Sequence, residues 1–237
     1  MKMDTGTHIA LSKLSTGVVW DTLRVMGLPH QALHHSIKGL ETSMTLCGPA
    51  FCVKGQTWFG TPPKPATNKP QPRYELFEHL YDGCIMLIDS GGYEEAVLMG
   101  ENFAISAVGA GCKGFVLDGA LRDATSMVEQ KIPVFNRFLT PASSAGSWSI
   151  VGYEVPIQLK GQTHATVNVM PGDWILADRD GVVVIPGRHV DKVAEYAARV
   201  EEVEIETRKL LVAGLQDRKT IYEKFDRFSH VKHIDQL

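Results

Sequence analysis

The sequence predicts a single α/β domain, and three features of the chain carry that prediction. Residues 100–130 read as helix, strand and helix in succession. Residues 84–88 (CIMLI) form a continuous apolar run, which is typical of a strand buried on both faces in a parallel sheet. Residues 155–185 hold several short strands separated by turn signals. Strands this closely spaced favour a compact mixed sheet or a barrel-like layer.

The first part of the chain supplies further elements in order. Ser15 or Thr16 is a suitable N-cap for a helix that ends at Gly27, because glycine readily adopts the left-handed conformation of a helix end. We expect a strand at 44–53 with a break at positions 48–49 (GP). The other elements expected before residue 140 are a helix at 74–80 and short strands at 96–99 and 133–135.

The second part of the chain is expected to be strand-rich and then helical. Residues 140–149 are rich in Ser, Ala and Gly and are predicted to form a loop. The expected strands are 155–159, 165–170, 174–177 and 182–185. Apolar residues on one face predict a helix at 189–213, and a second short helix is expected at 220–228.

Residues 60–72 carry five of the twelve prolines. Such a density excludes a helix or a central strand, so we expect an exposed loop. Two alternatives remain open for this loop. It is either a tolerated surface insertion or a lid or partner contact near a pocket, because long loops often carry function.

Length, composition and net charge limit the classes of protein to which the chain can belong. At 237 residues, with 44% hydrophobic and 22% charged residues, the chain has the balance of a soluble globular protein. The formal net charge of -3 argues against a general nucleic-acid-binding surface. No apolar run reaches membrane-spanning length, and no secretory signal is present, so we expect neither membrane nor nucleic-acid partners. The four cysteines form no CxxC pair, which favours reduced thiols in a cytoplasmic protein.

Residues 100–123 bring together the groups best suited to chemistry. A helix is expected to start at Gly100 and to end at the glycines 109 and 111, followed by a strand at 114–117, a turn at Asp118 and Gly119, and a helix at 124–130. The first backbone N–H groups of a helix lack internal partners and lie at its positive end. With glycine at position 100, the amides of Asn102 and Phe103 are therefore candidates to bind a small carboxylate.

Three side chains of the same segment complete a candidate site. Arg122 offers a planar, permanently charged fork that suits carboxylate or enolate oxygens. Asp123 and Glu101 supply hard oxygen ligands for Mg²⁺ or Mn²⁺, and an ion held by two carboxylates keeps several waters. Taken singly, each side chain has a simpler explanation: Asp123 as an N-cap, Arg122 as a surface residue and Glu101 as a favourable first-turn charge. Asp89, at a strand end, is expected to hold the turn at 90–92.

The spacing G-E-x-x-A-x-x-A-x-x-x-G-x-x-G-x-x-x-D-G-x-x-R-D in this segment resembles the RraA-like family. The likeness extends to residues 14–16 (LST), 27–29 (GLP), 48–50 (GPA), 89–92 (DSGG) and 171–182 (PGDWILADRDGV). The family contains class II pyruvate aldolases acting on 4-hydroxy-4-methyl-2-oxoglutarate and 4-carboxy-4-hydroxy-2-oxoadipate, and a non-enzymatic regulator of ribonuclease E. The resemblance implies a swivelling β/β/α-type layered domain, and it favours a joint site over the separate explanations.

Two functions from different classes follow from the resemblance. The first is a Mg²⁺- or Mn²⁺-dependent lyase that cleaves a 4-hydroxy-2-oxo acid to pyruvate, with oxaloacetate decarboxylation as a side activity. Its catalytic residues would be Arg122, Glu101 and a C-terminal glutamate, its substrate-binding residues Gly100, Asn102, Phe103 and Arg122, and its metal ligands Asp123 and Glu101. The alternative is a non-catalytic regulatory binding protein. A Schiff-base mechanism is disfavoured because Lys113, the one lysine of the segment, lies at a helix-to-strand turn.

The resemblance also bears on the C-terminal part of the chain. It divides the chain into an α/β domain at 1–187 and a helical extension at 188–237 that packs on a neighbouring subunit. In the resembling aldolases a glutamate of this helix reaches the pocket of a neighbouring subunit. Glu204 is the best match, with Glu202 and Glu206 as alternatives. A homo-oligomer is therefore expected, either a trimer or a hexamer.

Overall fold

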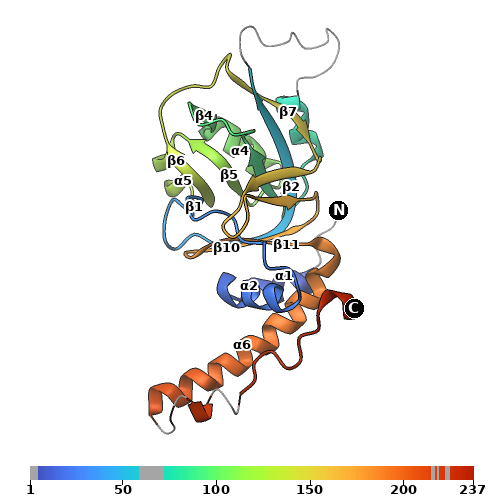
Figure 1. The fold of residues 1–237 in the computed structure, drawn as a ribbon. Helices are drawn as coiled ribbons and strands as arrows, with labels where there is room; N and C mark the ends of the chain where they lie inside the picture. Colours follow the sequence, from blue (N-terminus) through green and yellow to red (C-terminus); the bar gives the residue numbers. More distant parts are fainter. Residues whose placement is uncertain (1–4, 59–71, 215–216, 218, 222–224) are drawn as a thin grey trace.

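The computed structural model describes residues 5–58, 72–214, 217, 219–221 and 225–237. A parallel sheet forms its centre (Figure 1). The strands of this sheet are β2 (Leu46–Thr57), β3 (Ile85–Asp89), β5 (Gly114–Leu121) and β6 (Val134–Leu139), in that spatial order. The short strand β4 (Val97–Met99) adds in parallel to the end of β5, and β1 (Lys38–Gly39) adds antiparallel to β6. Every residue of β3 is buried, as its continuous apolar run predicts.

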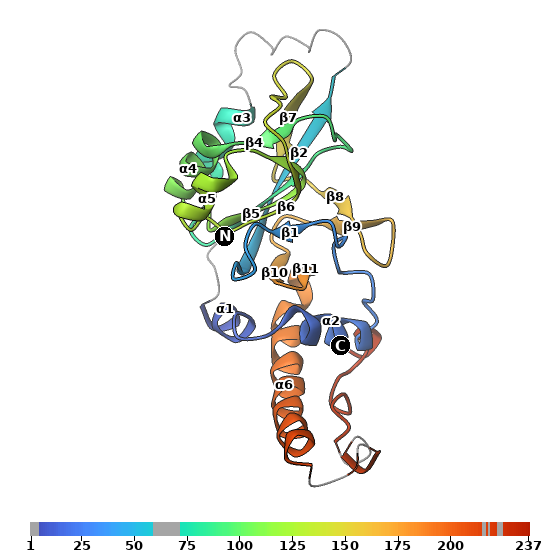
Figure 2. The same cartoon turned by 90° about the vertical axis from the view of Figure 1, so that its left-hand side faces the viewer.

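Alternate residues of this sheet feed two separate hydrophobic clusters. Met86 and Ile88 face one cluster, whereas Ile85 and Leu87 face the other. Helices cover the first face, and Figure 2 shows them together on one side of the molecule. They are α3 (Pro72–Glu75), which continues as the 3₁₀ turn η1 (Leu76–His79), α4 (Glu101–Gly109) and α5 (Ala124–Glu129).

A second layer of strands covers the other face of the sheet. It consists of β8 (Ile157–Lys160), β9 (Thr166–Val169), β10 (Trp174–Asp178) and β11 (Gly181–Ile185). In β10, Ile175 and Ala177 point into the cluster shared with the parallel sheet, while Trp174 and Leu176 point outward. This alternation gives β10 and β11 two apolar faces, and the sheets curve into a nearly closed, barrel-like layer.

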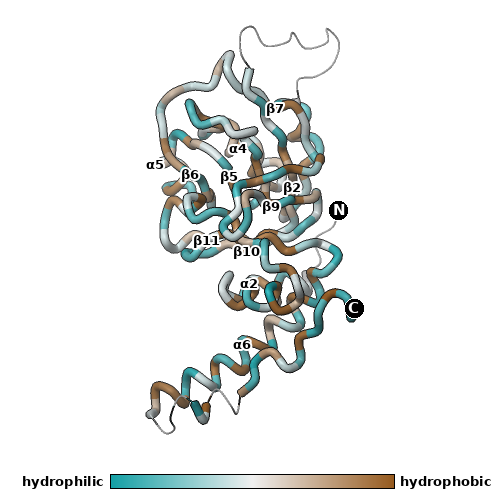
Figure 3. The backbone as a smooth tube through the Cα atoms, in the orientation of Figure 1, coloured by the Kyte–Doolittle hydropathy of each residue, from teal (hydrophilic) through white to brown (hydrophobic). Residues whose placement is uncertain are grey.

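The outer face of β10 and β11 is covered by helices from the two ends of the chain. These are α1 (Thr5–Leu11), α2 (Thr16–Val25) and α6 (Val190–Ala213). The Ser15 hydroxyl accepts a hydrogen bond from the Val18 N–H at 3.3 Å and so caps α2 as expected. The far half of α6 extends away from the sheets, and hydrophobic and hydrophilic residues alternate along it (Figures 1 and 3). None of the helices in the described ranges has the length and apolar character that crossing a membrane requires.

The α/β class, the layered arrangement and the C-terminal helical extension are therefore confirmed, but four local predictions were wrong. The first is the break in the strand at Gly48 and Pro49, because β2 runs through both residues. Its residues up to Pro49 pair antiparallel with β10, and those from Ala50 pair in parallel with β3. Proline is tolerated here because the strand changes partner at this point, so the ladder does not need the N–H that proline lacks.

The turn predicted at Asp118 and Gly119 is also wrong, because β5 continues through both residues to Leu121. The strand absorbs them as an irregularity in its pairing with β6, between Leu117 and Ala120. The Asp118 carboxylate accepts a hydrogen bond from the Lys160 N–H of β8 at 2.8 Å and lies 3.6 Å from the Arg137 guanidinium. Burial raises the pKa of Asp118, and both of these partners oppose that rise. The tertiary contact, which the local sequence does not reveal, keeps the strand extended.

The remaining corrections concern a strand that the sequence did not suggest and the C-terminal end. β7 (Trp148–Tyr153) pairs antiparallel with the far end of β2, so the predicted loop ends before Trp148. Of the helix expected at 220–228, residues 219–221 are helical, whereas 225–226 have no regular structure and 227–230 form turns. The prediction for the proline-rich segment lies outside the described residues, except that α3 begins at Pro72.

Candidate active site

The end of β5 and the start of α4 meet at one pocket. The Arg122 N–H donates to the Met99 carbonyl at 3.4 Å, which joins the end of β5 to the end of β4 just before α4 begins. The pocket has a volume of about 240 Å³ and is lined by Arg73, Gly100, Glu101, Asn102, Phe103, Arg122 and Asp123. The structure thus brings together six of the residues that the sequence singled out, and it adds Arg73.

Asp123 caps a helix, but not the helix that follows it. Its backbone is left-handed (φ 60°) at the N-cap position of α5, and its side chain makes no capping bond there. Instead, Oδ2 of Asp123 accepts a hydrogen bond from the Glu101 N–H at 3.0 Å, at the start of α4. The same oxygen lies 3.5 Å from Nε of Arg122. Asp123 therefore connects the two helix starts and leaves Oδ1 without a hydrogen bond among the described residues.

Position 100 needs a glycine because a larger side chain would collide with Asp123 and Arg122. A Cβ atom at this position would lie 2.6 Å from Oδ2 of Asp123 and 3.0 Å from Nε of Arg122. The backbone of Gly100 is extended (φ −137°), a conformation open to any residue. A side chain at position 100 would therefore fill the space that the carboxylate and the guanidinium occupy, without straining the main chain.

Glu101 is held by α5. Its Oε1 accepts hydrogen bonds from the Ser126 hydroxyl at 2.5 Å and from the Gln130 amide at 2.9 Å. Gln130 also donates to the Ser126 oxygen at 2.7 Å, so the three side chains form a closed set. Both bonds to the carboxylate fall on Oε1, which leaves Oε2 as the oxygen that a metal ion or a proton could reach.

The positive charge of the pocket comes from two arginines and a helix end. The Arg73 guanidinium lies over the Phe103 ring, 5.6 Å from its centroid. The Arg122 side chain is 45% exposed and its closest carboxylate contact is made through Nε, so its terminal nitrogens are available to a ligand. The N–H groups in the first turn of α4 add their partial positive charge. This arrangement suits a small carboxylate or a developing oxyanion.

Arg73 is the site residue that the sequence analysis missed. It lies in α3, directly after the proline-rich segment, and about 30 positions before the motif that carries the other residues. The only local signal is a cation at the start of a helix, which is common on protein surfaces. Its place in the pocket results from the packing of α3 and η1 beside α4.

The acidic residues of the pocket fit a hard divalent ion. The described residues contain no group of three or more His, Cys, Asp or Glu side chains arranged to hold a metal. Mg²⁺, however, commonly binds through one or two carboxylates and completes its shell with water and substrate oxygens. Oδ1 of Asp123 and Oε2 of Glu101 are the two carboxylate oxygens not engaged by the bonds above. The donor set therefore suits Mg²⁺ or Mn²⁺ and does not suit a soft metal.

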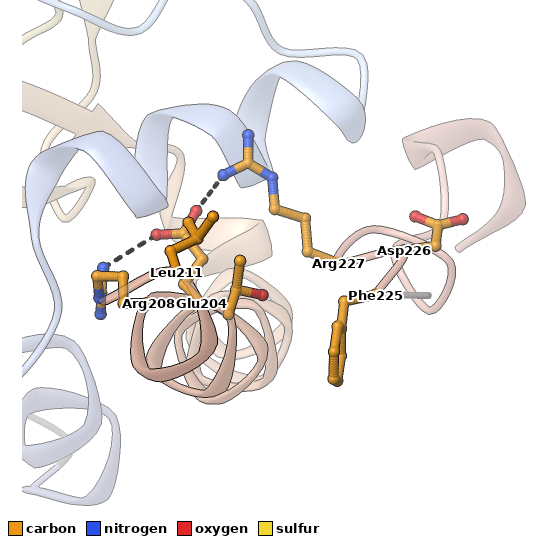
Figure 4. A pocket seen from close by; sticks show the side chains of 7 residues that line it. Glu204, Arg208, Leu211, Phe225, Asp226 and Arg227 are labelled. Atoms are coloured by element: carbon orange, nitrogen blue, oxygen red, sulfur yellow. Dashed lines mark hydrogen bonds and ion pairs between the residues drawn. The ribbon is translucent and has the colours of Figure 1, made fainter. Parts of the chain in front are cut away.

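Glu204 lies elsewhere, in the far half of α6 (Figure 4). Its carboxylate is held between Arg227, through an ion pair to Oε1, and Arg208, whose Nη1 lies 3.2 Å from Oε2. Arg227 also pairs with Asp21 of α2 at 3.3 Å, so the C-terminal segment is tied to two helices. The structure does not bring Glu204 to the pocket of its own chain, and a contact with such a pocket would require a second subunit.

The two alternatives to Glu204 are also outside the pocket. Glu202 is exposed, and Glu206 pairs with Lys209 at 2.7 Å on the surface of α6. Glu204 differs from both in being partly enclosed by the C-terminal segment. Together with Leu211 and Phe225 it lines a separate cavity of about 490 Å³. The Glu204 carboxylate is therefore held from two sides, whereas Glu206 has one exposed ion pair and Glu202 lies on the exposed surface of α6.

Residues 16–184 match a protein-family model described as RraA-like: Aldolase/RraA. A Thermus thermophilus protein named 4-hydroxy-4-methyl-2-oxoglutarate aldolase is 34% identical over 106 residues, which is 44% of this chain and 60% of that protein. A Halalkalibacterium halodurans protein named putative 4-hydroxy-4-methyl-2-oxoglutarate aldolase is 34% identical over 49% of this chain and 53% of its own length. The matches thus span little more than half the length of these relatives.

Solved structures share the fold over most of the chain. The crystal structure of Streptomyces coelicolor RraAS2, described as an unusual member of the RNase ES inhibitor RraA protein family, superposes with a TM-score of 0.74 at 22% identity. The superposition covers 88% of this chain and 99% of that one. At this identity the likeness supports the fold and leaves the chemistry open.

We predict that Gly100→Ala disrupts the candidate metal site while the protein stays folded. The new methyl group must displace the Asp123 carboxylate, so Mn²⁺ affinity measured by electron paramagnetic resonance titration should fall about 10-fold or more. Thermal unfolding should change little, since side-chain ends can move aside and the backbone is unstrained. Gly109→Ala, in the same helix and with nothing within 4 Å of the added atom, is the matched control and should keep both properties. Unchanged Mn²⁺ binding in Gly100→Ala would show that the close approach is unimportant.

Proposed function

The chain belongs to the RraA-like family, and from that premise we propose that it is a divalent-metal-dependent lyase that cleaves a 4-hydroxy-2-oxo acid to pyruvate by a retro-aldol reaction. One observation carries the proposal: Arg122, Asp123 and the N-terminus of α4 line the same small pocket. The names of the aldolase relatives from Thermus and Halalkalibacterium support the same reaction class. Oxaloacetate decarboxylation is proposed as a side activity, because it passes through the same pyruvate enolate.

The substrate would be anchored through its 1-carboxylate. The N–H groups of Asn102 and Phe103, in the first turn of α4, point their partial positive charge toward the pocket. Arg73 adds a full charge at the same wall, where its guanidinium rests on the Phe103 ring. Gly100 keeps the helix start open so that a ligand can approach the backbone. These groups fix the orientation of the 2-oxo acid before any bond is broken.

Cleavage breaks the bond between C3 and C4 and leaves its electron pair on C3, as the enolate of pyruvate. Arg122 would stabilise the negative charge that develops on the former keto oxygen, through the terminal nitrogens that its contact with Asp123 leaves available. A Mg²⁺ or Mn²⁺ ion held by Asp123 and Glu101 would supply Lewis-acid polarisation of that oxygen. The 4-hydroxyl loses its proton as C4 becomes a carbonyl carbon, and C3 gains a proton to give the methyl group of pyruvate.

A carboxylate near C4 is suited to accept the 4-hydroxyl proton. Glu101 is one candidate within the chain, as an alternative to its role as metal ligand, because both roles need the oxygen that Ser126 and Gln130 do not engage. The other candidate is Glu204 of a neighbouring subunit. The ion pairs of Glu204 with Arg208 and Arg227 hold the carboxylate at a fixed place on α6, as a residue shared between subunits would need.

We predict that the protein is a homo-oligomer, either a trimer or a hexamer. The far half of α6 extends beyond the domain and exposes apolar side chains, with Ile205 41% and Val212 89% accessible. Docking of this helix on a second copy would bury them and bring Glu204 toward another subunit's pocket. Multi-angle light scattering at micromolar concentration should give a mass at least three times that of one chain. A monomer would contradict both the assembly and the shared site.

We predict that activity requires a divalent cation. Exhaustive EDTA treatment should abolish pyruvate release from 4-hydroxy-4-methyl-2-oxoglutarate and from oxaloacetate, and Mg²⁺ or Mn²⁺ should restore it. Two carboxylates line the pocket, and none of the described residues that line it is a lysine. Borohydride added during turnover should trap no covalent adduct. Full activity after metal removal, or a reduced lysine adduct detected by mass spectrometry, would refute the metal-dependent mechanism.

We predict that Arg122→Ala lowers kcat about 10²–10³-fold, because a donor that acts on charge developing in the transition state contributes to kcat more than to KM. Arg122→Lys should recover little, since an ammonium group cannot reproduce the planar fork. Arg179→Ala removes an exposed arginine from the turn between β10 and β11 and serves as the charge-matched control.

Circular dichroism should show that both Arg122 variants remain folded, since the side chain is 45% exposed. If kcat of folded Arg122→Ala stays within about threefold of the wild type, Arg122 does not stabilise the enolate. The non-catalytic binding protein would then become the better explanation of the same pocket.

A further inference from the structure

A second cavity adjoins the proposed site. It has a volume of about 470 Å³ and shares Arg122 and Asp123 with the pocket at the start of α4. Its other walls come from the end of β5, the first residue of α5 and the end of β6 with the residues that follow it. Those walls are formed by Leu121, Ala124, Leu139, Thr140 and Pro141. The two cavities therefore lie on either side of the Arg122–Asp123 pair.

The walls of the second cavity are mainly apolar. Apart from the shared pair, no charged side chain of the described residues lines it. Leu139 is 55% exposed, although it is a large hydrophobic residue at the end of a central strand. The Thr140 hydroxyl already accepts a hydrogen bond from the Ala142 N–H at 3.3 Å. The Thr140 O–H and the first N–H groups of α5, which no side chain caps, remain as uncharged donors. The surface therefore offers mainly an apolar contact area and, among the described residues, no cation beyond Arg122.

The nearest cation on the same strand is committed elsewhere. Arg137 lies two residues before Leu139, and its side chain is only 13% exposed. Its Nη1 pairs with Glu94 at 2.5 Å, and its Nε lies 3.6 Å from Asp118. Turning Arg137 toward the cavity would leave Asp118 buried without its counter-charge, which is strongly unfavourable. Among the described residues of one chain, Arg122 is thus the one cation that lines this cavity, and in the proposed reaction it is engaged by the keto oxygen.

We propose that this cavity receives the C4 substituent of the substrate, so that the preferred substrates are 4-hydroxy-2-oxo monocarboxylic acids with an apolar alkyl group at C4. The products are pyruvate and an alkyl aldehyde. This inference rests on the proposed lyase function and makes Leu139 a specificity-determining residue. A substrate with a second carboxylate at this end, such as the dicarboxylic acid in the relatives' names, would lose part of the hydration of that group without gaining a counter-charge from the described residues.

The direct test compares two substrates. Pyruvate release is measured for 4-hydroxy-2-oxoheptanoate, which carries a propyl group at C4, and for 4-hydroxy-4-methyl-2-oxoglutarate, both with saturating Mg²⁺. The expected kcat/KM favours the heptanoate by about 10-fold or more, because each buried methylene contributes about fourfold and the carboxylate meets no counter-charge. A preference for the dicarboxylic acid overturns the proposal.

Variants of Leu139 test the same assignment with the substrates unchanged, so that intrinsic differences in reactivity between the two substrates cancel. Leu139→Arg supplies the missing cation, so it should lower kcat/KM for the heptanoate and raise it for the dicarboxylic acid, reversing the preference. Met170→Arg adds the same charge at another half-exposed apolar residue, in the turn before β10, and should leave the preference unchanged. Leu139→Ala, which adds no charge, should lower kcat/KM for the heptanoate several-fold. An unchanged preference in folded Leu139→Arg overturns the assignment.

A partial reaction distinguishes failure of this inference from failure of the proposed function. Exchange of the pyruvate methyl protons with deuterium, followed by NMR, needs the pocket at α4 and not the apolar cavity. Exchange that depends on Mg²⁺ and is equal in wild type and Leu139→Arg, together with the reversed preference, supports both. Normal exchange with a preference for the dicarboxylic acid overturns the apolar subsite alone. Absence of both exchange and cleavage overturns the lyase and the subsite together.

Discussion

The hydrogen bond from the Glu101 N–H to the Asp123 carboxylate, 3.0 Å long, joins the two parts of the candidate site. It satisfies one of the N–H groups that open α4, and it fixes the loop that leaves β5. The bond needs a glycine before Glu101 and a left-handed backbone at Asp123. Aspartate tolerates that conformation better than most residues, so one residue can provide both the left-handed backbone and the carboxylate. Arg122, adjacent in the chain, is placed at the pocket by the same geometry.

Buried carboxylates perform a related task deeper in the fold. Asp89 and Asp118 end or interrupt neighbouring strands of the parallel sheet, and each accepts a hydrogen bond from β8, at 3.4 Å from the Gln158 N–H and at 2.8 Å from the Lys160 N–H. Asp89 also accepts the Gly91 N–H at 2.8 Å, which confirms its expected role in the turn. These contacts attach the second layer of strands to the sheet whose ends carry the site. The desolvation of Asp118 is offset in part by Arg137.

The arginines that stabilise the fold differ from those of the pocket in how fully their side chains are paired. Arg137 and Arg227 each pair with acidic side chains of other elements, whereas Arg208 pairs with Glu201 and Glu204 of its own helix α6. Arg122 contacts only its neighbour Asp123 within the described residues, and through Nε rather than the terminal nitrogens. Arg73 lies on an aromatic ring. The two arginines of the pocket therefore leave most of their hydrogen-bonding capacity unused by the fold and available to a ligand.

The sequence by itself determined the α/β class, the buried strand β3, the helices α2, α4, α5 and α6, and the six motif residues that line the pocket. The elements follow from local periodicity and from glycine and capping chemistry, which act over a few residues. The six residues were joined into one site by the resemblance of their spacing to the RraA-like family. It did not determine the continuity of β2 through Pro49, the extension of β5 through Asp118, or the existence of β7. In each case a partner strand or side chain far away in sequence outweighs the local turn signal. The same holds for Arg73, for the apolar cavity at Leu139 and for the helix that Asp123 caps. Only the tertiary structure decided these, because they depend on which elements pack side by side, and the spacing of residues along the chain does not encode that directly.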